Sequence, residues 1–445
     1  MTGQYSRSEP RGADLKLIEK VTMKRVVWRI MPFVTLAYFI SYIDRVNIGI
    51  AALQMNKLLH IDAAQYGLAA GIFFISYCLL EVPSNLLLVR FGARRWLARI
   101  MISWGIVGFF MAFVTGPYSL YVVRFLLGAA EAGLYPGAIF YLARWFPARY
   151  RGRMIAIFGV AVPVSSFVGS PISAALLATN GMFGLHGWQW LFMLESVPAV
   201  LFGFLFLAFM ADGPETATWL TPAQRDWLVA ELASEQQKPR PVTLFSTWRV
   251  LGNPYVLGLA LVYAGSAGAT VGLGLWLPLI LKSFGLTNIQ AALLNMLPFG
   301  IASVAMVWWG IGSDKAGERL WRTILPLILA GVSLAATCVT TTLAPALILL
   351  SLALIGTYAL KGPFWALVND WVPAAGAAAA IAQINALSNL AGFGATYLLG
   401  YLKKATGSFP LACLPLVALT GMAVIALLLL SRRRGGGKTE EMAGA

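Results

Sequence analysis

Six ionisable residues lie inside segments of the chain that are otherwise apolar. They are Asp44, Arg45, Glu81, Arg124, Glu131 and Lys361. A charged side chain in such a segment is costly unless it faces the protein interior and finds a partner. A guanidinium offers a planar fork that matches a carboxylate, while a carboxyl group deprived of water resists ionisation. These residue types therefore indicate two kinds of chemistry, the binding of an organic anion and the uptake of protons.

Asp44 and Arg45 are adjacent in the stretch SYIDRVNIGIAALQMN, residues 41–56. On a helix they point about 100° apart, so one can face a central cavity while the other faces a neighbouring helix. Tyr42 lies three residues before Arg45 and shares its face. Tyr42 therefore either contributes to a binding site or only packs against neighbouring side chains.

Arg124 and Glu131 are seven residues apart and therefore share one face of their helix. This spacing favours an ion pair between them. Their charges and those of Asp44 and Arg45 sum to zero, so a buried cluster that only fastens two helices together is the alternative interpretation. Hydrophobic packing would fasten the helices without the cost of burying charges, which favours a functional role.

Two further pairs have the spacing of one helical turn. Lys361 and Trp365, in KGPFWALVND, can present a cation and a ring along one cavity-facing strip, or Lys361 only lines a wet pathway. Asn385 and Asn389, in INALSNLAGF, can donate to hydroxyl or carboxylate oxygens of a ligand, or make hydrogen bonds between helices.

The remaining intramembrane charges are given structural roles. Glu81, two residues before Pro83, is expected to accept hydrogen bonds near one end of its helix. Arg29 and Glu195 are assigned to helix ends, where snorkelling or capping accounts for them. The chain shows no cluster with metal-ligand spacing and no nucleophile–base pair, so neither a cofactor nor an enzymatic reaction is expected.

The elements that carry these residues must be membrane helices. Of the 445 residues 59% are hydrophobic and 11% charged, and the mean hydropathy is +0.75. Soluble proteins are about 25% charged. Apolar runs of about 20 residues, long enough to cross a bilayer as helices, recur along the whole chain. The sequence therefore predicts an all-α membrane protein. Its net charge of +15 lies in the connectors and does not indicate nucleic-acid binding.

About twelve membrane helices are predicted, in two sets of six. The first six lie near 27–53, 66–89, 98–115, 118–142, 154–177 and 188–210. The second six lie near 255–281, 287–311, 323–342, 344–368, 378–401 and 410–431. The expected organisation is an N-terminal segment 1–26, a six-helix bundle 27–210, a linker 211–254, a second six-helix bundle 255–431 and a tail 432–445.

Within the linker, Thr221 can cap a short helix that has Pro222 at its first position, and KPRP follows as extended chain. Lys and Arg concentrate before the first helix, after the second and fourth helices, and in the tail. The connectors on the opposite side carry few of them. Both termini are therefore expected on the cytoplasmic side of the inner (plasma) membrane.

The chain also contains an internal repeat. GIGSDKAGER, residues 310–319, follows the eighth helix, and NLLLVRFGARR, residues 85–95, follows the second. Arg90 and Gly92 occupy corresponding positions, with an offset of 225 residues between the two copies. Two homologous halves favour a transporter that rocks one half on the other, rather than a channel or an enzyme.

At this point the chain resembles the major facilitator superfamily over nearly its full length. The repeated loop motif is that superfamily's signature, which implies gating roles for Arg90, Gly92, Asp314 and Gly317. The copy in the second half is intact. The copy in the first half has Val89 where the family usually has an acidic residue.

More specific stretches resemble the anion:cation symporter family. They are YIDRVNIGIA, EVPSNLLL, RFLLGAAEAGLYPG, ARWFPARYRGRM, GWQWLFMLE and KGPFWAL. Within that family the chain looks closest to bacterial tartrate, phthalate and hydroxyphenylacetate permeases. The resemblance implies proton-coupled uptake of an organic carboxylate, such as tartrate, a sugar acid or an aromatic acid, by a protein that we expect to act as a monomer. A drug/proton antiporter of the same fold is the alternative, and a membrane-embedded enzyme is a remote one.

The resemblance also implies roles for single residues. Arg45 looks like the ligand of the substrate carboxylate, with Tyr77 as its neighbour. Asp44 and Glu131 look like the proton carriers, and Arg124 like the cation that sets their proton affinity.

Overall fold

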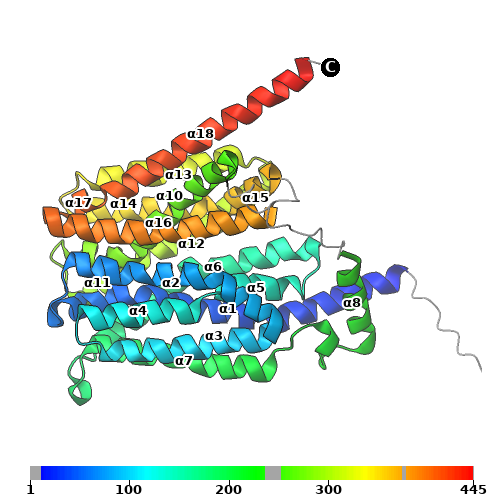
Figure 1. Ribbon diagram of the computed structural model, residues 1–445, viewed down its shortest axis with the longest axis horizontal. Helices are drawn as coiled ribbons and strands as arrows, with labels where there is room; N and C mark the ends of the chain where they lie inside the picture. The colour runs from blue at the N-terminus through cyan, green and yellow to red at the C-terminus, as the bar shows by residue number, and fades with distance from the viewer. Residues whose placement is uncertain (1–11, 236–251, 373–376, 444–445) are drawn as a thin grey trace, which may run out of the picture.

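The computed structural model describes residues 12–235, 252–372 and 377–443. Every regular element within these ranges is a helix, which confirms the all-α prediction. Long helices lie side by side with their axes roughly parallel (Figure 1). The KPRP stretch of the predicted linker lies outside the described residues.

The first half contains seven helices and three short 3-10 turns. They are α1 Gly12–Leu58, α2 Ala63–Phe91, α3 Ala93–Phe110, η1 Met111–Phe113, α4 Pro117–Glu131, α5 Leu134–Ala143, α6 Ala148–Leu177, η2 Met182–Gly184, α7 Gly187–Phe209 and η3 Pro214–Thr216. Helix α8, Pro222–Glu235, follows in the predicted linker. Its first turn is capped as expected, because the Gln224 amide donates to Thr221 Oγ1 at 3.4 Å.

The second half contains nine helices in the described ranges. They are α10 Pro254–Lys282, α11 Asn288–Leu294, α12 Met296–Ala316, α13 Leu320–Thr337, α14 Leu343–Ala359, α15 Lys361–Trp371, α16 Ala377–Thr406, α17 Phe409–Ala412 and α18 Leu414–Ala443. Figure 1 shows α18 extending beyond the other helices at its C-terminal end, past the predicted limit of residue 431.

Eleven helical segments of the described chain are long and apolar enough to cross a membrane. They match eleven of the twelve predicted helices. The twelfth, predicted near 378–401, is present as α16, which has 30 residues. Polar residues in its first half, among them Gln383, Asn385 and Asn389, make it less apolar than the others. The twelve-helix prediction is therefore correct in number and order.

Helix α1 begins fifteen residues before the predicted start at residue 27. Residues 12–26 continue the helix because one of their faces is covered, with Thr22, Met23 and Val26 all buried. The Arg25 guanidinium donates to Gln224 Oε1 of α8 at 3.0 Å. The predicted N-terminal segment is thus in part an extension of the first membrane helix, held by the helix of the linker.

One predicted membrane helix is broken next to a candidate site residue. The fourth ends as α4 at Glu131 and resumes as α5 after Gly133, whose φ of +90° favours glycine. The tenth is divided into α14 and α15 at Leu360, directly before Lys361, but the backbone at Leu360 stays helical. Breaks at membrane depth are tolerated where the freed backbone lies against protein, and Ser84 Oγ donates to the Ala132 carbonyl at 2.6 Å.

The same helix pairings occur in both halves. In the first half α1 packs on α6 and α7, α3 on α4 and α7, and α2 on α4. The corresponding helices of the second half repeat this pattern: α10 packs on α16 and α18, α13 on α14 and α18, and α12 on α14. Between the halves, α2 packs on α16, α6 on α12, and α1 on α10. The internal repeat seen in the sequence is therefore a repeat of architecture.

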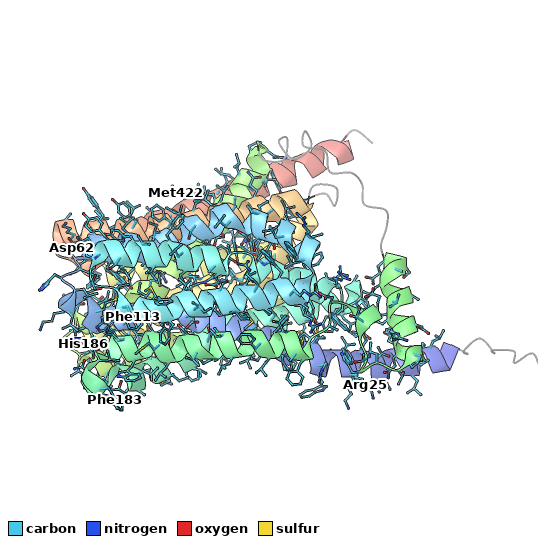
Figure 2. The ribbon with its side chains drawn as sticks, turned by 60° about the horizontal axis from the view of Figure 1, so that its bottom comes forward. Arg25, Asp62, Phe113, Phe183, His186 and Met422 are labelled. Carbon is cyan, nitrogen blue, oxygen red and sulfur yellow. The ribbon has the colours of Figure 1, made fainter. Side chains whose placement is uncertain are left out.

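The two ends of the molecule are held by different contacts. Figure 2 shows Asp62, Phe113, Phe183 and His186 at one end of the helices and Arg25 at the other. At the Asp62 end, Lys404 Nζ of α16 lies 2.9 Å from Asp62 Oδ2, which ties the two halves together.

At the Arg25 end, ion pairs connect the α1 extension, the start of α6 and α8. Arg149 lies 2.9 Å from Glu19 and 3.2 Å from Glu231, and Arg151 lies 3.5 Å from Glu235. Helix α8 is therefore anchored to the first half of the molecule.

Candidate functional site

Arg45 lies at the centre of the candidate site. Its guanidinium forms an ion pair with Glu131 and lies over three rings, with distances to the ring centroids of 5.6 Å for Tyr42, 5.2 Å for Phe73 and 5.1 Å for Tyr77. The Arg45 side chain is 13% exposed, whereas that of Glu131 is 1% exposed. Arg45 is therefore the member of the ion pair that a solute can reach. The structure brings together Tyr42, Arg45, Tyr77 and Glu131, as the sequence-based site requires.

Glu131 is held from α1 by two groups. Ser41 Oγ donates to Glu131 Oε1 at 2.6 Å, and the same oxygen accepts from Arg45. Ser41 and Arg45 are one helical turn apart, so a single face of α1 grips the end of α4. Ser41 was not predicted as a site residue, although its spacing from Arg45 is a signal for it.

Asp44 faces away from this ion pair, as its adjacency to Arg45 predicts. Trp104 Nε1 of α3 donates to Asp44 Oδ2 at 2.7 Å. The Asp44 side chain is buried, and its second oxygen, Oδ1, has no hydrogen-bond partner among the described residues. Arg45 and Asp44 thus connect α1 to two different neighbouring helices.

The predicted ion pair between Arg124 and Glu131 is wrong. Arg124 is fully buried and donates to two carbonyls of α2, Ala69 O at 3.3 Å and Ala70 O at 3.1 Å. Seven residues along a helix correspond to about 10 Å, which is too far for direct contact between these side chains. In addition, Glu131 is already bound by Ser41 and Arg45. Arg124 therefore fastens α4 to α2, and its guanidinium lies 4.9 Å from the centre of the Phe73 ring that also faces Arg45.

Lys361 approaches the site from the second half. Its Nζ lies 4.3 Å from the centre of the Tyr358 ring, and Tyr358 in turn lies beside Tyr42 of α1. Among the described residues, no carboxylate lies within ion-pair distance of Lys361. Trp365, one turn later, packs 4.9 Å from the Tyr263 ring. Lys361 is therefore a half-buried cation that has no carboxylate partner in the described part of the chain.

Asn385 makes the hydrogen bond between helices that was the alternative to ligand binding. Its Nδ2 donates to Glu81 Oε1 of α2 at 3.2 Å. Glu81 is thus a hydrogen-bond acceptor, as expected. Asn389 is half-buried on the same helix. The contact between Asn385 and Glu81 joins the two halves on the side of the site opposite to Asp62 and Lys404.

The glycines of the two motif loops both have a positive φ, but their backbone conformations differ, since ψ is 144° at Gly92 and 6° at Gly317. Gly92, between α2 and α3, has a φ of +87°, and Gly317, after α12, has a φ of +64°. A side chain at Gly92 would collide with Asp212, because a Cβ there would lie 2.8 Å from Asp212 Oδ1. That oxygen accepts a hydrogen bond from the Arg94 amide at 2.9 Å.

The charged residues of the two motif loops differ in their contacts. Asp314, in the last turn of α12, forms an ion pair at 2.7 Å with the nearby Arg319, which precedes α13, rather than with a residue across the molecule. Arg90 lies 5.6 Å from the ring centroid of its neighbour Phe91.

Glu195 does not lie at a helix end, and the role given to it from the sequence is wrong. It lies two turns inside α7, is 6% exposed, and accepts a hydrogen bond from Ser173 Oγ at 2.6 Å. Arg29, in contrast, does cap a helix: it donates to the Phe209 carbonyl at the end of α7, at 3.3 Å.

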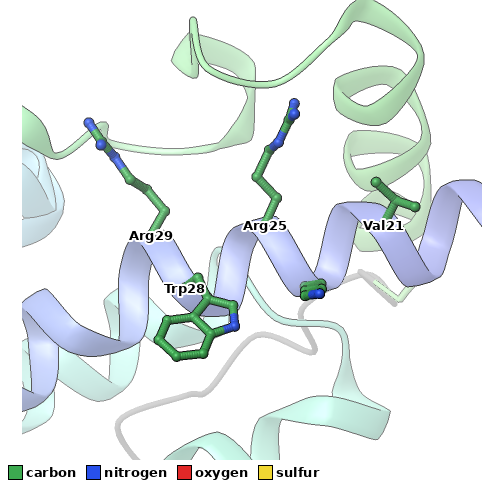
Figure 3. Close-up of a pocket in the computed structure, with 5 residues that line it drawn as sticks. Val21, Arg25, Trp28 and Arg29 are labelled. Atoms are coloured by element: carbon green, nitrogen blue, oxygen red, sulfur yellow. The ribbon is translucent and has the colours of Figure 1, made fainter.

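A surface hollow of about 420 Å³ lies away from the site. It is lined by Val21, Lys24, Arg25, Trp28 and Arg29 on the α1 extension. Figure 3 shows Arg25 and Arg29 pointing to one side of the helix and Trp28 to the other. Arg25 donates to the Trp219 carbonyl and Arg29 to the Phe209 carbonyl at the end of α7. None of the predicted substrate ligands is among the residues that line this hollow. Within the described ranges no cluster of three His, Cys, Asp or Glu could hold a metal ion.

Comparison with known proteins identifies the class. The profile of the Major Facilitator Superfamily matches residues 34–396. The fold agrees: the crystal structure of a D-xylose–proton symporter superposes with a TM-score of 0.72 at 18% identity, covering 91% of this chain and 97% of that one. A bacterial homologue of the lysosomal transporter Spinster gives 0.74 at 18% identity, covering 91% and 96%. The chain belongs to the major facilitator superfamily, and it is a transporter rather than an enzyme.

Several relatives align along most of the chain. A protein named "Putative tartrate transporter" from Agrobacterium vitis is 44% identical over 415 residues, 93% of this chain and 92% of its own. The quinolone resistance transporter of Acinetobacter baumannii is 35% identical over 393 residues, covering 88% and 90%. A protein named "Putative metabolite transport protein NicT" from Pseudomonas putida is 35% identical over 407 residues, covering 89% and 91%.

Proposed function

We propose that this protein imports an organic carboxylate together with protons, and that Arg45 binds the carboxylate. The observation that carries the proposal is the ion pair between Arg45 and Glu131. A partly exposed guanidinium is held there by a buried carboxylate, in an aromatic setting formed by Tyr42, Phe73 and Tyr77. A substrate carboxylate has the same chemistry as the Glu131 side chain and can replace it on Arg45.

This exchange couples the two ligands. When Glu131 binds a proton it no longer needs the charge of Arg45, and the guanidinium fork is free for the substrate. When the substrate leaves, Arg45 and the ionised Glu131 pair again. Each proton also compensates part of the charge of the incoming anion, which lowers the cost of reorienting the loaded carrier. Asp44, on the same turn of α1, is the second acid in the proposal. Arg124 of α4, which is hydrogen-bonded to carbonyls of α2, is the nearby cation that favours ionisation of these acids.

The second half supplies the remaining contacts of the proposed site. Lys361, which pairs with no carboxylate in the described ranges and lies over the Tyr358 ring, suits the second carboxylate of a diacid. The substrate pathway in this proposal is also lined by Trp365, Asn385 and Asn389. We further propose that the two halves, residues 27–210 and 255–431, rock against each other to give alternating access. In this proposal the carrier is a monomer in the inner membrane, with both termini in the cytoplasm.

A drug/proton antiporter is the second candidate. It is favoured by one observation, the 35% identity to the quinolone resistance transporter. Quinolone antibiotics carry a carboxyl group, so Arg45 could bind them as well. The two candidates differ in the direction in which protons move relative to the substrate, and in ligand preference.

Ligand preference is measured by thermal unfolding of the purified protein. A ligand that binds the folded state raises the melting temperature, by an amount that grows with its concentration. We expect tartrate, phthalate or a sugar acid to raise it, and threitol, which has the carbon skeleton of tartrate without its carboxyl groups, to leave it unchanged. Stabilisation by a quinolone but by none of the small acids would favour the second candidate. A response to threitol equal to that of tartrate would contradict carboxylate recognition.

Asp314 is expected to act in gating rather than in binding. It lies in the last turn of α12 and is paired with Arg319, which precedes α13. Asp314→Asn should slow transport several-fold while equilibrium substrate binding stays near the wild-type value. Binding measured by thermal shift and transport measured in proteoliposomes separate the two effects. A large loss of affinity would place Asp314 in the binding site instead.

A further inference from the structure

One end of the helices carries basic residues almost without acids. It is the end that holds Asp62 (Figure 2). Besides Asp62 and two histidines, the charged side chains at this end of the described chain are Lys57, Lys282, Lys403 and Lys404, which we call the lysine rim. In the proposed orientation this end faces outward, where lysine and arginine are normally scarce. Four lysines against one aspartate therefore call for an explanation.

The ends of helices account for only part of this pattern. Each lysine of the rim lies in the last turn of α1, α10 or α16, where the helix dipole favours a cation. The same dipole favours acids where helices begin. The helices that begin at this end, α2, α4, α7, α11, α14 and α17, nevertheless have no acidic residue in their first turns. The dipole thus explains single lysines but not the scarcity of acids that would neutralise them.

Two lysines of the rim bridge the two halves of the molecule. Lys282 Nζ of α10 donates to the Leu53 carbonyl of α1 at 3.4 Å, and also to Asn288 Oδ1. Lys404 Nζ of α16 lies 2.9 Å from Asp62 Oδ2, at the start of α2. Both contacts cross from the second half to the first. The rim therefore lies where the halves meet, which is where a pathway between them would open at this end.

Lys57 and Lys282 form a pair related by the internal repeat. They are 225 residues apart, the same offset as between the two motif loops. The Leu53 carbonyl that accepts from Lys282 Nζ lies four residues before Lys57 in α1, and is thus the helical acceptor of the Lys57 amide. One lysine from each half therefore meets at the same carbonyl. Neither side chain forms an ion pair within the described ranges.

We propose that the lysine rim is an entry site for organic anions, which it attracts to the mouth at the Asp62 end before they reach Arg45. This inference deepens the proposed function and rests on it. The partner that fits is a small carboxylate, and a dianion more than a monoanion, because the attraction grows with charge. Opening of this end must break the hydrogen bond from Lys282 to the Leu53 carbonyl. Since that carbonyl is neutral, opening exposes a cation without a counter-charge when the pathway is accessible from this side.

Uptake of the carboxylate into proteoliposomes, with the Asp62 end facing the medium, tests the rim at two ionic strengths. Exposed charges act over about 10 Å in 0.1 M salt but only about 3 Å in 1 M salt. At low ionic strength Lys57→Glu should raise KM about threefold to tenfold and leave the maximum rate near the wild-type value, because capture is slowed and transport is not. The difference should vanish in about 1 M salt. Lys57→Arg, which keeps the charge, should behave like the wild-type protein.

The matched control is Lys20→Glu, which reverses an exposed lysine at the other end of the same helix. Its KM should stay at the wild-type value, and the melting temperatures of all variants show that they are folded. An unchanged KM in Lys57→Glu at low ionic strength would overturn the proposal. So would a raised KM that persists in high salt, or an equal rise in Lys20→Glu.

A thiol reporter tests the field of the rim without any transported substrate. Ser283, exposed beside Lys282, is replaced by cysteine in a variant whose native cysteines are replaced by alanine. Its reaction rates with an anionic, sulfonate-bearing thiosulfonate and a cationic, trimethylammonium-bearing one are then compared. The ratio of the anionic to the cationic rate should fall about tenfold on addition of Lys57→Glu from the other half, and stay unchanged on addition of Lys20→Glu.

An unchanged ratio in the Lys57→Glu background would overturn the proposal. If the wild-type protein took up no carboxylate at either ionic strength, the proposed function would fail. The ratio of the two reaction rates would then still decide whether the rim attracts anions.

Discussion

Replacing Arg45 by lysine should abolish tight binding of the substrate while leaving the protein folded. Lysine keeps the positive charge but removes the planar fork that binds a carboxylate through two parallel hydrogen bonds. Loss of one hydrogen bond to a charged group costs about 1.5–3 kcal/mol, so Kd should rise by about tenfold to a hundredfold. The affinity of purified Arg45→Lys for its carboxylate, measured by calorimetry, checks this.

The matched control is Arg99→Lys. Arg99 also lies on a membrane helix and over an aromatic ring, 4.1 Å from the centre of Trp96, but it is outside the candidate site. Its replacement should leave affinity near the wild-type value. If Arg45→Lys binds and transports like the wild-type protein, direct bidentate binding by Arg45 is excluded. Lys361 then becomes the stronger candidate, because Arg124 is already bound to the carbonyls of Ala69 and Ala70.

Replacing Glu131 by glutamine should separate exchange from accumulation. The amide mimics the protonated acid and cannot form an ion pair with Arg45, so the guanidinium stays available to substrate. Counterflow exchange of substrate should therefore persist, while uphill accumulation driven by a pH gradient should fail.

Two measurements on Glu131→Gln distinguish this account from a purely structural role of the ion pair. Glu231→Gln, on the exposed helix α8, serves as the control and should accumulate substrate normally. If the ion pair only fastens α1 to α4, Glu131→Gln should lower the melting temperature and leave concentrative uptake intact in the folded fraction. Normal accumulation by Glu131→Gln would refute its role in coupling.

Much of this fold could be predicted from the sequence because lipid leaves few alternatives. Apolar runs of helical length define the twelve helices, and the repeated loop motif indicates their twofold repetition. The break after Glu131 could not be predicted, since it lies within a continuous apolar run. It depends on tertiary contacts, such as the hydrogen bond from Ser84 to the Ala132 carbonyl.

The site was predictable in composition but not in its pairings. The adjacency of Asp44 and Arg45 correctly predicts that they face different helices. Which partner each one finds depends on distances between helices, which a sequence does not contain, and the partner expected for Arg124 was therefore wrong. The assignment of Glu195 to a helix end is a different kind of error. It lies two turns inside its predicted helix, and counting residues from that helix's start would have revealed a buried acid.

The central claim is that protons and an organic carboxylate enter together. It is tested most directly by a pH-sensitive dye inside proteoliposomes that contain the purified protein, with substrate added outside and no imposed gradient. The account predicts that a carboxylate identified by thermal shift acidifies the interior, that the size of this change follows substrate uptake, and that threitol has no effect. Alkalinisation of the interior on substrate entry would show antiport and contradict the account, as would substrate entry without any change in internal pH.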